Sequence, residues 1–301
     1  MKQKKILKLI SALSLIILVL SNFSSCKVKS KEYDYVYFGE YPQTLKADDV
    51  IITSDIDSRG YYLGSDGCYY AKVVATPYEW YNTKECTFST GTAVKKGSVY
   101  YFKVEPIRWR ILCKTDGKAL VMCDSIIANK AFDTRTKQPG EGDKILNNYG
   151  ESEIRFWLNN QFYNIAFTDT QKESIITTVV DNSLESSGVS NSTYSFNDTE
   201  DKLFLLSYSD LYNKDYGFDG HLCVERQLEP SDYAKATGTE VFNKDQELNG
   251  YGCGYWLLRS PWDGGSGQNV YIVHAQSYLS LGLVQDSQFG VVPAMWITLE
   301  S

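Results

Sequence analysis

Side chains that commonly do acid–base or nucleophilic chemistry are scarce or unpatterned in this 301-residue chain. Its two histidines, His221 and His274, lie in no catalytic motif, and no Gly-x-Ser-x-Gly sequence offers a nucleophile at a strand-to-helix turn. The 37 Asp and Glu residues include no pair that stands out for glycoside hydrolysis, which depends on a separation in space. We therefore predict no catalytic residue, and a triad assembled only in space stays an alternative.

The chain also has seven cysteines, and one of them, Cys26, is treated below with the N-terminus. No two have Cys-x-x-Cys spacing, so neither a zinc site nor a thioredoxin-like site is indicated, and we predict no metal and no cofactor. Two alternatives stay open for the other six: the disulfides Cys68–Cys86 and Cys223–Cys253, or six free thiols.

One further disulfide can be argued against from a predicted hairpin. Asp116-Gly117 is a typical two-residue turn between apolar segments. The resulting register sets Cys113 opposite Leu120 and turns Cys123 to the other face of the sheet. A Cys113–Cys123 bridge would then have poor geometry.

The N-terminus has the layout of a secretory signal, with four lysines before a largely apolar run from Leu9 to Leu20. That run is about 12 residues long, whereas a membrane-spanning helix needs roughly 20. Phe23-Ser24-Ser25-Cys26 resembles the lipobox of bacterial lipoproteins, whose cysteine carries the lipid anchor. We predict a signal peptide over 1–25, a tether over 26–32 and one domain over 33–301. The protein would then be exported and held at a membrane outside the cytoplasm; an ordinary signal peptide or an uncleaved anchor is the alternative.

The charge of the chain argues against nucleic acid as a partner. The formal net charge is −7, and it becomes −11 without the predicted signal, which holds four lysines and no acidic residue. An acidic surface repels phosphate backbones, and no run of basic residues follows residue 31.

Hydrophobic periodicity predicts strands first, then helices, then strands again. The strands are expected at 35–39 (stopped by Pro42), 68–74, 98–104, 107–113, 118–123, 203–206, 255–258, 269–275, 278–284 and 290–299. Helices are expected at 151–167, capped by Ser152, at 169–176, capped by Thr168 or Asp169, and at 229–235, with a helical turn at 207–212. Residues 44–66, 78–97, 182–200 and 260–267 are expected to be loops. This order favours an α+β fold with antiparallel sheets.

Six blocks in order along residues 38–297 resemble the motifs of one bacterial family, a domain of unknown function found in surface proteins and lipoproteins. They are FGEYPQ (38–43), EPIRWRIL (105–112), IRFWLN (154–159), DKLFLLS (201–207), WLLRSP (256–261) and GVVPAMWI (290–297). The family is similar to the C-type-lectin-like fold of formylglycine-generating enzymes, which implies antiparallel sheets, two main helices, long loops and adjacent terminal strands. Val292 stands where the family usually has Arg, so contacts of that Arg are not expected here.

The resemblance also implies where a ligand would bind, on loops and strands of the C-terminal half. The residues there with aromatic faces or directional polar groups are Trp262, Asp263, Gln268, Asn269, Tyr271, Gln276, Tyr278, Gln285, Asp286 and Gln288. Structural roles are expected for Trp109, Trp157, Arg259 and Trp296, with Arg259 paired to a buried acid or a carbonyl. The calcium-binding motifs of sugar-binding lectins are matched only in part, at Gln138-Pro139 and Glu229-Pro230.

These observations favour a non-catalytic binding module on a membrane surface, with a carbohydrate or a protein as its ligand. A glycan-acting envelope enzyme and a structural envelope protein are the alternatives, and the sequence does not decide between them.

Overall fold

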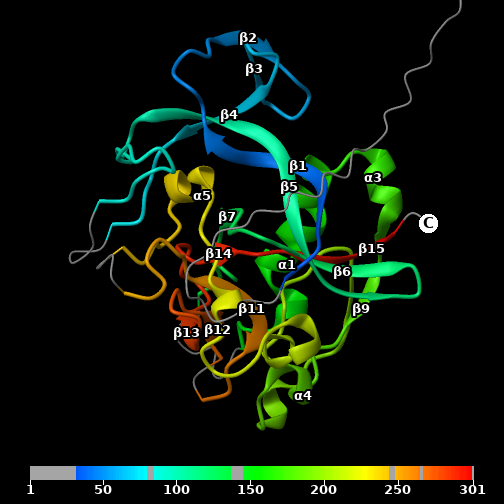
Figure 1. The fold of residues 1–301 in the computed structure, drawn as a ribbon. Helices are drawn as coiled ribbons and strands as arrows, with labels where there is room; N and C mark the ends of the chain where they lie inside the picture. Colours follow the sequence, from blue (N-terminus) through cyan, green and yellow to red (C-terminus); the bar gives the residue numbers. More distant parts are fainter. Residues whose placement is uncertain (1–31, 80–84, 137–144, 244–247, 265–266, 300–301) are drawn as a thin grey trace, which may run out of the picture. The chain divides into compact units, whose positions relative to one another are not determined.

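The computed structural model describes residues 32–79, 85–136, 145–243, 248–264 and 267–299. A long twisted sheet contains both the first and the last strand of the described chain (Figure 1). Its order is β2-β3-β4-β5-β6-β15-β8, with β1 paired to the other side of β5. The bounds are β1 Tyr35–Leu45, β2 Ile52–Ile56, β3 Tyr62–Gly64, β4 Tyr69–Val74, β5 Val99–Thr115, β6 Lys118–Cys123, β8 Ile175–Ile176 and β15 Ala294–Thr298.

A second sheet is built mainly from the C-terminal quarter, in the order β13-β12-β11-β14-β7. Its strands are β7 Ala128–Asn129, β11 Trp256–Pro261, β12 Asn269–Val273, β13 Leu279–Leu283 and β14 Gly290–Val291, and a separate pair joins β9 Thr178–Val180 to β10 Thr199–Asp201. Among the strand pairs described, β11–β14 is parallel and the others are antiparallel. The fold is therefore α+β with predominantly antiparallel sheets, as the sequence predicts.

The helices are short, and along the sequence they lie between β7 and β11. They are η1 Tyr149–Glu151, α1 Glu153–Trp157, the π-helical turn η2 Leu158–Phe162, α2 Tyr163–Ala166, α3 Asp169–Ser174, α4 Leu184–Ser187, η3 Ser192–Tyr194, η4 Asp210–Tyr212, η5 Lys214–Tyr216, η6 Val224–Arg226 and α5 Asp232–Thr237. Ser152 caps α1 by accepting from the Arg155 N–H, and Thr168 forms a capping box with Gln171 at α3. The predicted helix over 151–167 is thus one helical segment interrupted by a π-helical turn.

β5 carries the centre of the first sheet, and its side chains follow the predicted alternation only in part. Ile107 and Trp109 are fully buried and Arg108 is exposed. A bulge between Ile111 and Cys113 inserts one residue and changes the face. Leu112 is consequently buried, whereas the prediction placed Ile111 and Cys113 on the inner face.

Three sequence predictions about the first sheet are wrong in detail. The first strand does not stop at Pro42, because β1 pairs with β5 alone and proline is tolerated on such an edge strand. The segments predicted at 98–104 and 107–113 form one strand that passes through Pro106, opposite Glu40. The predicted loop over 44–66 contains β2 and β3.

Two boundaries in the C-terminal half also differ from the prediction. The helix expected at 229–235 begins later, at Asp232, because the Ser231 side chain accepts from the Ala234 N–H and caps it. The loop expected at 260–267 loses its first two residues to β11, where Ser260 and Pro261 are buried.

The cysteines make no disulfide in the part of the chain that the structure describes. Cys68, Cys86, Cys113, Cys123, Cys223 and Cys253 are all free, so the bridges Cys68–Cys86 and Cys223–Cys253 are not formed. The predicted hairpin register is confirmed, with Cys113 opposite Leu120. Cys26 lies outside the described residues, as does the predicted signal peptide. No helix among the described residues is long and apolar enough to cross a membrane.

Candidate functional site

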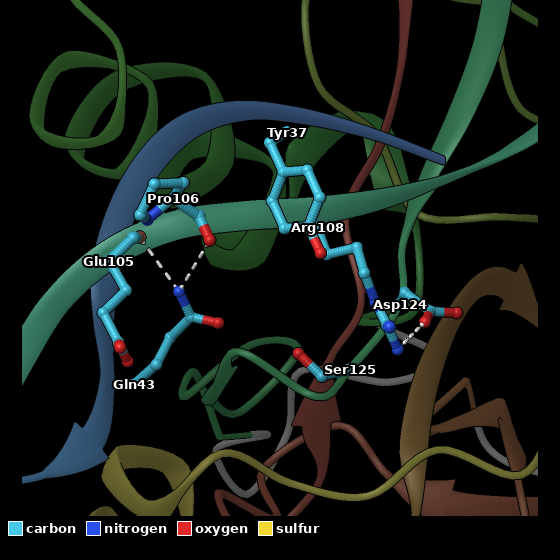
Figure 2. Close-up of a pocket in the computed structure, with 7 residues that line it drawn as sticks. All are labelled: Tyr37, Gln43, Glu105, Pro106, Arg108, Asp124 and Ser125. Carbon is cyan, nitrogen blue, oxygen red and sulfur yellow. Dashed lines mark hydrogen bonds and ion pairs between the residues drawn. The ribbon is translucent and has the colours of Figure 1, made fainter. Parts of the chain in front are cut away.

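A groove runs along the first sheet where β1 and β5 face the loop after β6 and the segment before α5. It consists of two adjoining cavities of about 440 Å³ and 640 Å³, which share Gln43, Arg108, Asp124 and Ser125. Figure 2 shows the residues of the smaller cavity, in which Gln43 reaches under β5 and Arg108 reaches to Asp124.

The floor of the groove is an Arg–Asp–Arg cluster. The Asp124 side chain is 4% exposed, and its Oδ1 accepts from Arg110 Nε at 2.8 Å and lies 2.6 Å from Arg110 Nη2. Its Oδ2 lies 2.5 Å from Arg108 Nη2. Partial burial lowers the pKa of the Arg108 guanidinium, but Asp124, Tyr35 and Tyr37 together outweigh it, so the pKa is raised. Two arginines therefore share one buried carboxylate, which fixes their side chains.

Tyr35 and Tyr37 of β1, with Tyr33 just before it, form a row of rings along these arginines, called the tyrosine ladder below. Across the β1–β5 register, Tyr35 faces Arg110 and Tyr37 faces Arg108. Each guanidinium, however, lies over the tyrosine two residues earlier, with Arg110 4.7 Å from the Tyr33 ring and Arg108 4.9 Å from the Tyr35 ring. These are cation–π contacts that hold the outer face of β1 against β5.

Tyr37 is the next ring of this ladder and opens onto the groove. It is 63% exposed, whereas Tyr35 is 40% exposed. The β5 residue two positions before Arg108 is Pro106, which has no cation to lay over the ring. The face of Tyr37 is thus available to a ligand, and aromatic faces of this kind receive sugar rings or cations.

Polar groups surround this ring. Gln43 Nε2 donates to the carbonyl oxygens of Glu105 and Pro106, which orients its amide oxygen as an acceptor. Glu105 Oε2 accepts from the N–H and the hydroxyl of Thr44 at 3.2 and 2.6 Å. The groove therefore offers fixed donors and acceptors rather than mobile surface chains.

The far wall is held by Asp232, the first residue of α5. Its carboxylate accepts from the N–H and hydroxyl of Ser89 and from the N–H of Leu45, so it ties β1 to α5. Lys235 lies 3.9 Å away from the same carboxylate. Asp232 is 3% exposed and serves the fold, while Glu229 on the same wall is exposed.

The ten residues predicted to bind a ligand are all half-buried, and none lines the groove. A first group lies around the start of β12. Asp263 Oδ2 accepts from the N–H groups of Ser190 and Asn191, and the Tyr271 ring is 4.9 Å from that of Tyr208. The others of this group are Trp262, Gln268 and Asn269, of which Trp262 donates its N–H to the Asn269 carbonyl.

A second group sits on the turn between β12 and β13. The Tyr278 ring stacks on His274 at 4.1 Å, and the Gln276 N–H donates to His274 Nδ1. Buried Arg226 pins this turn by donating to the carbonyl oxygen of Ser277. The side chains of this turn are consequently engaged within the protein.

A third group follows β13. Gln285 Nε2 donates to the Arg135 carbonyl, and Gln288 bonds to the Asp286 carboxyl. Burial raises the pKa of nearby Glu240 to about 7, with a further contribution from Asp286. A carboxyl that holds its proton near neutral pH beside a second carboxyl could take part in acid–base chemistry, but neither lines the groove.

The four residues predicted to be structural are placed as follows. Trp109 is fully buried and its Nε1 donates to the Phe38 carbonyl at 2.7 Å, and Trp157 is 8% exposed. Arg259 donates to Asp210 and to the Leu205 carbonyl, both at 2.8 Å, and these are an acid and a carbonyl. Trp296 packs half-buried against the main core. Among the described residues, no group of three His, Cys, Asp or Glu side chains could hold a metal ion.

The sequence alone does not predict the groove, although two of the rows that border it have a visible pattern. Tyr33, Tyr35 and Tyr37 recur with period two, as do Arg108 and Arg110. Two outward aromatic and cationic rows on predicted strands indicate cross-strand pairing. What the sequence did not show is that β1 pairs with β5.

Comparison with known proteins finds one family match. The family is described as "Domain of unknown function (DUF6273)", and its model matches residues 116–299. No curated protein and no solved structure matches the chain. The match includes Asp124, Ser125 and the far wall of the groove, whereas Tyr37, Gln43 and Arg108 precede it. Because the match covers more than half of the chain, the protein belongs to this family of domains of unknown function.

Proposed function

We propose that the protein is a non-catalytic binding module, exported and lipid-anchored at Cys26, whose ligand site is the groove between β1, β5 and α5. The observation that carries the proposal is the Tyr37 ring, 63% exposed above a floor of mutually fixed charged side chains. Preorganised polar groups beside an open aromatic face are typical of sites that bind carbohydrates and protein side chains.

Support for export and anchoring comes from the N-terminal sequence, with its basic start, short apolar run and Ser24-Ser25-Cys26. The C-type-lectin-like architecture is part of the same proposal. The predominantly antiparallel sheets support it, but the adjacent terminal strands that the resemblance implies are not found, because β5 and β6 lie between β1 and β15.

Glycan and peptide arrays probed with the full-length protein would test the binding role. We expect ligands whose binding is weakened in Tyr37→Ala and unchanged in Tyr69→Ala, which removes a 37% exposed tyrosine on β4 outside the groove. Binding that is unaffected by Tyr37→Ala would contradict the assignment of the groove.

The anchor is tested separately by mass spectrometry of the protein from membranes. We expect a mature N-terminus at Cys26 carrying lipid, and a Cys26→Ala variant that no longer fractionates with membranes. An intact Met1 with an unmodified Cys26 would contradict it.

A further inference from the structure

The tyrosine ladder repeats one contact with a constant offset. Arg110, opposite Tyr35, covers Tyr33, and Arg108, opposite Tyr37, covers Tyr35. Each arginine thus lies over the ring two positions nearer the N-terminus than its cross-strand partner. The same rule would place a cation from β5 position 106 over Tyr37.

Position 106 breaks the rule, because Pro106 has no charged side chain. A shift in the β1–β5 register between Tyr37 and Glu40 also sets Pro106 opposite Glu40, whereas a regular register would set it opposite Gly39. The exposed fraction rises along the ladder accordingly, to 40% at Tyr35 and 63% at Tyr37. Among the residues that the structure describes, Tyr37 is therefore the ring of the ladder that no cation covers.

The charges around the groove favour a cation as the missing partner. Arg108 and Arg110 share Asp124, and Lys235 lies near Asp232. Glu105 and Glu229, which line the two cavities, have no ion pair among the described residues. The Arg–Asp–Arg cluster carries one positive charge in excess. The two unpaired acids, Glu105 and Glu229, outnumber it, so the groove has a net negative charge. A neutral sugar on Tyr37 would leave both of these acids unpaired.

We propose that the groove binds a protein or peptide ligand through an arginine side chain, whose guanidinium stacks on Tyr37 and pairs with Glu105. This proposal rests on the groove being the ligand site. Guanidinium is favoured over ammonium because it is planar, can lie flat on a tyrosine ring and can still direct its N–H groups to a carboxylate. The chain already makes this contact twice, at Tyr33 and at Tyr35.

The test titrates the full-length protein with the peptide acetyl-Gly-Gly-Arg-Gly-Gly-amide, followed by NMR. Its matched control carries citrulline, which keeps the shape of arginine without its charge. We expect the arginine peptide to bind more tightly than the citrulline peptide, and to bind more weakly as salt is added. An exposed cation–π contact of about 0.5–1 kcal/mol predicts a two- to fivefold loss of affinity in Tyr37→Ala.

Three variants locate the contact. Tyr37→Phe should keep most of the affinity that Tyr37→Ala loses, since the ring is kept. Glu105→Gln should bind more weakly, and Tyr69→Ala should change nothing. Equal binding of the arginine and citrulline peptides, no binding of either, or an affinity that Tyr37→Ala leaves unchanged would each overturn the proposal.

The same variants separate this inference from the proposed function. If neutral glycans bind and lose affinity in Tyr37→Ala while the arginine peptide does not bind, the groove is the ligand site and the arginine specificity is wrong. If array ligands bind and none responds to Tyr37→Ala, the groove assignment itself fails, and the arginine proposal fails with it.

Discussion

Asp124 illustrates how much one side chain can hold in place. Its side chain is buried, it pairs with two guanidiniums, and its backbone N–H also donates to the Arg108 carbonyl. Such a carboxylate adds little net energy over an apolar core, but removing it leaves buried positive charge uncompensated. The cluster therefore orients the groove floor more than it stabilises the fold.

Substitutions in the cluster should therefore differ in their effect on stability. Asp124→Asn should lower the free energy of unfolding by about 3 kcal/mol, because Arg110, 9% exposed in its side chain, loses its counter-charge. Arg108→Ala should cost less than about 1 kcal/mol, since the Arg108 side chain is 53% exposed. Urea unfolding measures the stability of both variants. Equal losses would contradict the view that Asp124 is needed mainly to compensate the buried charge of Arg110.

A second residue-scale prediction concerns two groups that titrate in opposite senses. Burial and Asp286 raise the pKa of Glu240 to about 7, so the folded state holds a proton that the unfolded state releases near pH 4.5, the ordinary value. The contribution of Glu240 to the free energy of unfolding therefore falls as the pH rises from 4.5 to 7. Burial lowers the pKa of His274 to about 4 from 6.5, so stability from the histidine falls as the pH drops from 6.5 to 4.

Between pH 4.5 and 6.5 the two groups therefore change the free energy of unfolding in opposite directions. Each contributes about 1 kcal/mol after a discount for solvent screening. Relative to the wild type, Glu240→Gln should gain stability as the pH rises through this window, and His274→Gln should gain it as the pH falls. Thermal unfolding across the window measures both. A Glu240→Gln curve parallel to that of the wild type would show that the carboxyl is not perturbed.

At the scale of elements, a glycine allows β1 to bend against the helical segment. Gly39 has φ +70°, and a Cβ there would lie 2.5 Å from the Phe167 ring and 2.9 Å from the Ala166 carbonyl oxygen. It lies in the register shift between Tyr37 and Glu40, so it permits the irregularity that opens Tyr37 to the groove.

Gly39→Ala should therefore lower the free energy of unfolding by about 3 kcal/mol, which combines backbone strain with overpacking. Gly60→Ala is the matched control, because Gly60 has φ +85° but no atom within 4 Å of its Cβ position. It should cost only the strain, about 1 kcal/mol. Equal losses in chemical denaturation would show that the close approach is not significant.

The elements that follow from local chemistry are those that the sequence predicts best. The Asp116-Gly117 turn predicts the β5–β6 register, and Ser152 and Thr168 predict two helix starts. The extent of β1 past Pro42 is set by its position at a sheet edge, which is a tertiary property that no local pattern contains. The bulge after Ile111 is likewise not predictable, because no glycine or other turn residue marks it in the sequence.

At the scale of the whole molecule, the groove was the least predictable part. Tyr37, Arg108 and Asp124 belong to three segments, and only the β1–β5 pairing and the end of β6 bring them together. The residues implied by the resemblance lie elsewhere, and many already serve neighbouring backbone groups, as Asp263 does at Ser190.

A prediction at this scale concerns the thiols. Alkylation of the denatured, unreduced protein should label all six cysteines that the structure shows as free. In the native protein, Cys123 should react slowest, because full burial raises the pKa of its thiol to about 12. Mass spectrometry gives both results, and a label count of four would indicate one disulfide.

The central place of β5 has a practical consequence for anyone who trims the protein to its family match. A fragment that starts at residue 116 keeps β6 but loses all of β5, including Ile107 and Trp109. β6 would then present a bare row of amide and carbonyl groups beside uncovered apolar side chains. Such an edge recruits strands from other copies, so the truncated fragment should precipitate where the full chain stays dispersed.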